Sequence, residues 1–319
     1  MDEKGYIINS LSFLLIIPAV LLVFLLLEVN NVGIETSSVS LQSKNVFYVL
    51  NDLKNNVPQI SKQVLNETSM QIIEHGAVND SRNVIKEKLQ IKINQIIAKS
   101  ESNEDLRINF TVNSVESSED PFIIQINSTI YVKKNNVVHY ENISQNISIE
   151  GLPDCLPFIK CSGFGKPEII EDKVNYNYSL YEFLNQKNIS NSEVYINATS
   201  PFLIKRCPYE PYITHGTLLT LKNCIENGYY HKSYDGACYL CRMEGKNICP
   251  HYGIETFIIP QYMTNSTCIQ APCSSDHVLF NETTFFGMGI VYHQNNQNYY
   301  KIFLDNGHRL KYGLNEYLD

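Results

Sequence analysis

The sequence contains no tryptophan and fewer basic than acidic side chains. Its 25 Lys and Arg residues stand against 33 Asp and Glu residues, giving a formal net charge of -8. Nucleic-acid binding requires a basic face, so this balance argues against a nucleic-acid partner. The sequence also lacks a phosphate-binding loop, an H-E-x-x-H motif and EF-hand spacing. What remains is a composition typical of a globular protein, with 44% hydrophobic residues and 21 tyrosines.

Charged residues are also missing from a long run near the N-terminus. Residues 11–27, LSFLLIIPAVLLVFLLL, contain none, and the apolar segment extends back to Tyr6. At about 20 residues it is long enough to cross a hydrocarbon core of ~30 Å. It is longer than the apolar region of a signal peptide, and no small-x-small cleavage site follows. We therefore predict a retained transmembrane helix over residues 6–27, within an anchor of residues 1–28, with a cleaved signal as the alternative.

The charges that flank this segment predict its orientation. Lys4 and the α-amino group precede it, whereas no Lys or Arg follows it until Lys44. Positive charges are retained on the cytoplasmic side, so we expect the N-terminus inside. The protein is then expected in the cytoplasmic or plasma membrane, with the bulk of the chain extracytoplasmic.

The tripeptide N-x-[ST], the acceptor for N-glycosylation, is unusually frequent. The composition predicts roughly four by chance, and the observed number is more than twice that. All lie after the apolar segment, which supports an extracytoplasmic location. We expect glycosylation at Asn66, Asn79, Asn109, Asn127, Asn142, Asn146, Asn177, Asn188, Asn197, Asn265 and Asn281.

The first part of the chain after the anchor predicts helices followed by a sheet. Over residues 37–99 apolar residues recur at spacings of three and four; Pro58 is expected to interrupt the first helix, and Asp80 or Ser81 to cap the last. The segments LRINFTV, FIIQINSTIYV and ENISQNISIE then alternate in polarity. Because a strand buries one face, the parity predicts a half-buried antiparallel meander with four sequons on its solvent face: Asn109, Asn127, Asn142 and Asn146.

We predict an α+β fold with three parts after the anchor. Helices packed on an antiparallel meander form a membrane-proximal domain of residues 37–150. Residues 151–167, rich in Pro, Gly and Cys, are interpreted as a linker. Residues 168–319 are predicted to form a small cysteine-rich, mostly β domain. Near its end, Asn306-Gly307 between apolar runs predicts a hairpin turn.

A short charged leader ends at Lys4-Gly5 and meets the apolar helix directly, and a helix and an antiparallel sheet are predicted to follow. This order of parts resembles archaeal type IV pilin-like proteins. The resemblance implies that a membrane peptidase cuts after Gly5, so that the chain begins at Tyr6, and that the helix packs into a filament. Ser10 stands where that family has an acidic residue. The remainder is similar to single-anchor cell-surface proteins of methanogens, so the expected partners are the membrane, other pilin-like subunits or surface glycans.

Nine cysteines follow the anchor, where disulfides persist if the chain is outside. An odd number leaves at least one without a partner in the same chain. Pairing of Cys155 with Cys161 and of Cys268 with Cys273 is sterically easy, but spacing does not fix connectivity. The candidates for disulfides are Cys155, Cys161, Cys207, Cys224, Cys268 and Cys273.

The stretch DGACYLCRMEGKNICPH combines three cysteines with a histidine. Cys238, Cys241, Cys249 and His251 have the residue types of a zinc site, of which C-x2-C is the commonest half. A redox-active pair is disfavoured because the flanking strand and helix are missing. The third interpretation is a disulfide scaffold. An extracytoplasmic location favours disulfides, and one structural zinc is the alternative.

No catalytic signature surrounds the other histidines and cysteines, so we assign no catalytic residue. The sequence favours a membrane-anchored surface protein with a structural, adhesive or pilin-like assembly role. The rival hypothesis is an extracytoplasmic enzyme or a zinc-binding module centred on residues 238–251.

Overall fold

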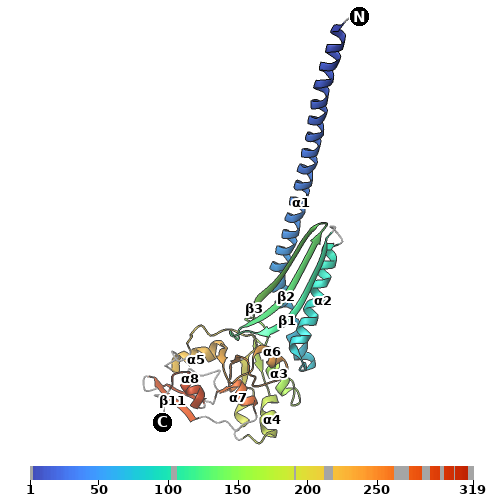
Figure 1. Cartoon of the computed structure of the whole chain (residues 1–319). Coiled ribbons are helices and arrows are strands. Elements are labelled where there is room, and N and C mark those ends of the chain that lie inside the picture. Colours follow the sequence, from blue (N-terminus) through green and yellow to red (C-terminus); the bar gives the residue numbers. More distant parts are fainter. Residues whose placement is uncertain are drawn as a thin grey trace. The chain divides into compact units, whose positions relative to one another are not determined.

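Helices and small antiparallel sheets alternate along the chain in the computed structural model (Figure 1). This agrees with the predicted mixed α+β class. The chain divides into two compact units: residues 1–56, 95–110 and 130–141 form unit 1, and residues 57–94, 111–129 and 142–319 form unit 2. The structure describes residues 3–101, 106–189, 192–211, 218–261, 273–281, 288–294, 298–304 and 306–314.

Helix α1 (Glu3–His75) is a single helix of 73 residues (Figure 1). It continues through Pro58, so the predicted interruption there is wrong. A proline removes one backbone hydrogen bond, but burial of the neighbouring face offsets that loss. Val57 and Ser61 are both fully buried, and Ser61 Oγ donates to the Val57 carbonyl at 2.7 Å.

The environment of α1 changes along its length. Every residue from Ile16 to Gly33 is exposed, and this segment has a mean hydropathy of 2.0. Among the described residues it is the one stretch long and apolar enough to cross a membrane. From Val46 onward the helix buries one face at helical spacing: Val46, Leu50, Leu53, Val57, Val64, Leu65 and Ile72.

Helix α2 (Ser81–Glu101) follows a turn, as predicted. Asp80 Oδ1 accepts a hydrogen bond from the Asn83 backbone nitrogen at 3.0 Å, which is N-cap geometry and confirms Asp80 as the cap. Glu244 adds a second cap, because its Oε1 accepts from both the nitrogen and the hydroxyl of Ser81, at 3.0 and 2.8 Å. The start of α2 is therefore tied to the cysteine-rich segment.

Strands β1 (Arg107–Ser117), β2 (Ile123–Lys134) and β3 (Val137–Ser148) form a sheet in that order. Burial alternates along β1 and β2, which confirms the predicted parity. Asn265 lies outside the described residues. None of the other sequon asparagines is buried; those exposed or half-exposed are Asn66, Asn79, Asn109, Asn127, Asn142, Asn146, Asn177, Asn188, Asn197 and Asn281.

The rest of unit 2 combines short helices with two- and three-stranded sheets, and β4-β5-β6, β7-β8 and β9-β10 are the paired groups. The predicted linker contains α3, whose side chains are largely buried. The elements are α3 (Leu156–Cys161), β4 (Glu168–Ile170), β5 (Lys173–Asn175), α4 (Ser179–Gln186), a 3-10 helix (Ser192–Tyr195), β6 (Thr199–Pro201), α5 (Leu218–Asn227), β7 (His231–Ser233), α6 (Tyr239–Met243), β8 (Gly253–Glu255), β9 (Phe257–Ile258), β10 (Ser274–Ser275) and α7 (Asp276–Phe280).

The C-terminal segment agrees only partly with the prediction. Strands β11 (Met288–Gln294) and β12 (Asn298–Leu304) pair antiparallel, in agreement with the predicted β content of this region. The predicted turn at Asn306-Gly307 is wrong, because Asn306–Lys311 forms helix α8. Helical spacing places His308 and Tyr312 on one face, where both contact the buried Glu255, at 3.2 and 2.5 Å.

Candidate metal centre

The four ligands predicted from the sequence lie together in unit 2. Cys238, Cys241, Cys249 and His251 each offer a ligand atom, all within 4.8 Å of one another. His251 Nδ1 lies 3.7 Å from Cys238 Sγ and 3.6 Å from Cys241 Sγ. A tetrahedral zinc ion with ordinary bond lengths sets its ligand atoms about 3.6–3.8 Å apart. The measured separations therefore match a tetrahedral site.

A tight knuckle brings the three sulfur atoms together. Cys238 is extended, α6 starts directly after it, and the Arg242 nitrogen donates to the Cys238 carbonyl at 2.9 Å. Gly245 has a φ of +73°, which reverses the chain and lets the Lys246 nitrogen donate to the Cys241 carbonyl at 3.1 Å. The chain then returns to Cys249, whose Sγ accepts from the Cys238 nitrogen at 3.2 Å.

Two glycines place the histidine beside this knuckle. A Cβ on Gly253 would lie 2.3 Å from the Gly236 carbonyl oxygen, so the two backbones touch. The Ile254 nitrogen donates to the Ala237 carbonyl at 3.1 Å. Strand β8 is thus held against the residue before Cys238, and His251, just before β8, reaches the thiols.

Helix α2 and strand β1 surround the cluster with hydrogen-bond donors. Ser117 Oγ donates to Cys238 Sγ at 3.1 Å. Arg82 Nη1 lies 4.0 Å from Cys241 Sγ, and its Nη2 is 3.3 Å from Ser117 Oγ and 3.4 Å from His251 Nε2. Groups of this kind orient metal ligands and balance the charge of thiolates.

The electrostatics favour a thiolate at Cys238. Hydrogen bonds from the Cys241 and Cys249 thiols and from Ser117 hold its pKa well below the ordinary value of a thiol. The pKa of Cys241 is raised, because the neighbouring Cys238 sulfur carries the negative charge. Burial alone would lower the pKa of Arg82, but the hydrogen bond to Cys241 and the nearby acidic groups raise it. Metals bind the thiolate form, so the negative charge at Cys238 favours the binding of a cation.

A buried ion group fixes α6, the helix that carries Cys241. Arg242 is 1% exposed, and its guanidinium donates to Asp154 Oδ1 at 3.0 Å and to Asp276 Oδ2. The Tyr230 hydroxyl donates to Asp154 Oδ2 at 3.0 Å. Burial alone would raise the pKa of Asp276, but the charge of Arg242 lowers it. This network joins α6 to the residues that precede α3 and begin α7.

A second group of ionisable side chains also meets the distances of a metal site. In it, the carboxylate of Glu255 is already neutralised by Lys311 Nζ at 2.6 Å and receives a hydrogen bond from Tyr312. An ammonium group at this distance occupies the place of a cation, so we interpret the group as an ion network. Its members are Asp235, Glu255, His277 and His308.

The other predicted cysteines have different surroundings. Cys155 and Cys161 are buried thiols, and burial raises the pKa of each to about 12. Cys155 Sγ contacts the Ser69 carbonyl at 3.7 Å, whereas Cys161 hydrogen-bonds with Ser179. Cys273 is buried too, but Cys268 lies outside the described residues, and so does its predicted pairing. High pKa values make the first two thiols unreactive.

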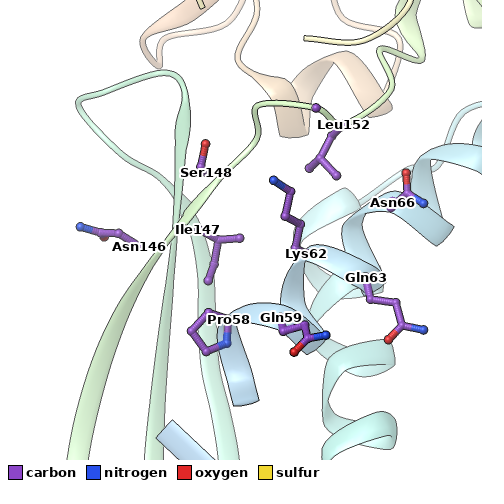
Figure 2. A pocket seen from close by; sticks show the side chains of 10 residues that line it. Pro58, Gln59, Lys62, Gln63, Asn66, Asn146, Ile147, Ser148 and Leu152 are labelled. Carbon is purple, nitrogen blue, oxygen red and sulfur yellow. The ribbon is translucent and has the colours of Figure 1, made fainter. Parts of the chain in front are cut away.

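An open groove of about 650 Å³ lies elsewhere in unit 2, between α1 and the end of β3. Figure 2 shows Ile147 pointing toward Pro58 and Lys62 reaching toward Leu152. Lys62 Nζ donates to the Glu150 carbonyl at 2.8 Å. The groove contains no cluster of ionisable side chains, so the cysteine cluster remains the better candidate for a functional site.

Sequence reasoning found the four ligands but missed the side chains around them. Arg82 and Ser117 are 159 and 121 positions away from the cysteines they contact, and no local pattern links them. The buried ion group could have been suspected from Arg242, because a charged residue directly after C-x2-C in a compact cysteine-rich stretch needs a partner of opposite charge when it is buried.

No protein-family model, curated protein or solved structure matches this chain.

Proposed function

We propose that the protein is a single-pass surface protein anchored by the N-terminal part of α1. The observation that carries this proposal is the exposure of every residue from Ile16 to Gly33. Residues 16–27 are apolar on all sides of the helix, and the polar residues Glu28, Asn30 and Asn31 lie near the end of the segment. Such a helix requires an apolar environment. Its 18 residues span about 27 Å, close to the thickness of a hydrocarbon core.

An extracytoplasmic location for the rest of the chain has two supports. Lys4 precedes the apolar segment and no basic residue follows it until Lys44, which favours an inside N-terminus. None of the described sequon asparagines is buried, so each is available to a glycosyltransferase. We propose glycosylation at these sites.

The role we propose is structural or adhesive, with pilin-like assembly as its specific form. The apolar segment continues without a break into the part of α1 that is buried from Val46 onward. This order agrees with the resemblance to archaeal pilin-like proteins. A filament of such chains would pack the Ile16–Gly33 segments together, and the lipid bilayer would hold them before assembly.

Fractionation of the full chain tests the anchor. Leu21→Arg with Leu25→Arg is expected to move the protein from alkali-resistant membranes to the soluble fraction, because each Arg costs about 2.5–3.5 kcal/mol at a bilayer centre. Phe47→Arg with Tyr48→Arg is the matched control, since both side chains are exposed beyond the segment. A wild-type chain that stays soluble without detergent would contradict the proposal.

The N-terminus tests assembly separately. A mature chain that begins at Tyr6 supports pilin-like processing after Gly5, whereas a retained Met1 excludes it. Glycosylation is measured on the same material as a loss of mass after enzymatic or chemical deglycosylation.

We further propose that Cys238, Cys241, Cys249 and His251 bind one structural zinc ion. Thiolate and imidazole are the ligands zinc prefers, and four protein ligands leave no open position, which is typical of a structural site. Three thiolates and one Zn²⁺ carry a net charge of minus one, which the Arg82 guanidinium balances. A disulfide between two of the cysteines would leave the third sulfur and the imidazole without this common partner.

Metal analysis of the purified full chain tests the site. We expect about one zinc per chain, and additional reactive thiols after chelation. Cys238→Ser should lose the metal, and Cys155→Ala, which removes a buried thiol outside the cluster, should retain it. A metal-free protein whose three cluster cysteines resist alkylation would support the disulfide alternative instead.

A further inference from the structure

We propose that Cys207 and Cys224 form a disulfide bond with each other. Their Sγ atoms are 3.3 Å apart, and the side chains are 1% and 0% exposed. Two sulfurs bound to one tetrahedral zinc ion stand about 3.8 Å apart, so these sulfurs are closer together than a shared zinc ion would place them. A disulfide requires them to approach to ~2.05 Å.

A histidine lies near this pair. His231 forms a group with Cys207 and Cys224, and its ring lies edge-on to Phe257 and Tyr312, with centroids 5.8 and 5.1 Å away. Within the described part of the chain, no further Cys, Asp, Glu or His joins the three. A metal ion shared by the three is the alternative to the disulfide, and it would leave the two sulfurs unlinked.

Backbone hydrogen bonds already hold the two cysteines in place. The Cys207 nitrogen donates to the Tyr230 carbonyl at 2.9 Å, and the Tyr229 nitrogen donates to the Cys224 carbonyl at 3.0 Å. The segment that carries Cys207 and helix α5, which carries Cys224, therefore meet at the same pair of residues.

The chemistry requires an oxidant, and the proposed location supplies its class. Cys207 and Cys224 each lose the thiol proton, and the two sulfurs together lose two electrons as the S–S bond forms. The disulfide of an extracytoplasmic dithiol oxidase accepts them and becomes two thiols. The inference thus rests on the proposed extracytoplasmic location, whereas the pairing itself rests on the 3.3 Å geometry.

The proposed pairing distinguishes the disulfide cysteines from the candidate metal ligands. Cys224 is committed to Cys207 and does not serve the cluster formed by Cys238, Cys241 and Cys249. Among the described residues, the 238–251 cluster then contains three thiols and one imidazole.

Peptide mapping of the full chain from native membranes tests the pairing. The protein is denatured and alkylated without reductant, then digested. We expect one linked pair of peptides containing Cys207 and Cys224, which separates on reduction with a mass gain of about 2 Da as two hydrogens are added. Alkylation of both residues before reduction, or linkage of either to another cysteine, overturns the proposal.

Protease accessibility on intact cells distinguishes failure of the pairing from failure of the location. If protease cleaves the protein on intact cells and Cys207 and Cys224 are reduced, the disulfide alone is overturned. If the protein is protected from the protease and both thiols are reduced, the location and the disulfide are overturned together. As a control variant, Cys155→Ala should leave the linked peptides unchanged, because that buried thiol makes its contact at Ser69. If the Cys155→Ala variant loses the linkage between Cys207 and Cys224, the bond involves a different cysteine and the pairing is overturned.

Discussion

The two cysteine groups of unit 2 differ in what surrounds their sulfur atoms. In the 238–251 cluster, donors from Arg82 and Ser117 reach the sulfurs, and the side chain of Cys249 is partly exposed. Cys207 and Cys224 are fully buried, and their neighbour His231 lies against aromatic rings. Charged and polar donors stabilise a thiolate, whereas apolar burial favours neutral sulfur. Under the two proposals, environment and not spacing alone separates a metal ligand from a disulfide cysteine.

Removal of the metal should produce the largest effect. Structural zinc contributes about 10–16 kcal/mol in isolated zinc fingers, and a smaller share of several kcal/mol is expected inside a larger unit. We expect chelation to lower the Tm by roughly 10 °C or more. Calorimetry with and without chelator measures the shift. An unchanged Tm in a protein shown to have lost zinc would remove the structural role of the cluster.

Breaking the buried ion group should come next. Arg242→Met leaves Asp154 and Asp276 buried without their cation, so the free energy of unfolding should fall by about 3–5 kcal/mol. Arg206→Met is the control, because that partly exposed arginine should cost about 1 kcal/mol or less. Denaturant unfolding compares the two. Equal losses would show that α6 does not depend on the network. If both variants retain the proposed Cys207–Cys224 linkage, the loss of stability comes from the buried ion group and not from the disulfide.

Removal of the disulfide should cost less than removal of the metal. The double variant Cys207→Ala with Cys224→Ala reopens a loop of 17 positions, for which chain entropy predicts about 3 kcal/mol. The zinc content should stay at the wild-type value, since the two groups are independent. Denaturant midpoints and metal analysis on the same sample provide both readings. A drop in zinc would show that the groups are coupled.

High pH should weaken the ion network around Glu255 and strengthen metal binding by the 238–251 cluster. Burial lowers the pKa of His277, but hydrogen bonds to Asp235 and Asp276 and the charge of Glu255 outweigh it and raise the pKa to about 9. Because the folded pKa exceeds the ordinary 6.5, this stabilisation is complete below pH 6.5 and is lost as pH rises through 9.

The loss should amount to at most about 3 kcal/mol. His277→Gln should flatten the decline in unfolding free energy between these values, as followed by urea unfolding across the range. Metal binding by the thiolates strengthens over the same interval. His308 and Lys311 also face Glu255, so a decline that persists in His277→Gln would move the titration to them.

The smallest effect on stability should come from the donor beside the cluster. Arg82→Gln removes the charge that balances the thiolates, and we expect zinc affinity to fall 10–100-fold. At fixed free zinc this lowers the unfolding free energy of the metal-loaded form by about 1.4–2.7 kcal/mol. Lys86→Gln, further along α2, is the control. Competition with a chromogenic chelator measures both. Equal affinities would show that Arg82 is not part of the metal environment.

Local patterns predicted what local interactions determine. The alternation in β1 and β2 and the Asp80 cap follow from neighbouring residues, and both are confirmed. The predicted break at Pro58 and the turn at Asn306-Gly307 are wrong, because distant contacts outweigh local preference: burial of α1 in the first case, and the contacts of α8 with Glu255 in the second.

The candidate site shows the same division. The C-x2-C knuckle and its histidine were visible as spacing, whereas the proximity of Cys224 to Cys207 depends on how α5 folds back. Sequence spacing allows many pairings, and only three-dimensional packing selects among them. Arg82 was invisible for the same reason, because 159 positions separate it from Cys241.

The same separation along the chain also determines the order in which the parts of the candidate site are synthesised. Arg82 and Ser117 leave the ribosome long before Cys238, so the helix and strand that flank the centre are synthesised before any of its ligands. The last ligand, His251, completes the set only when most of the chain has been made. Under the proposed extracytoplasmic location, the cluster thiols would be exposed during that interval to the same oxidant that would join Cys207 to Cys224. Prompt delivery of metal would then decide whether these cysteines become ligands or are captured in incorrect bonds.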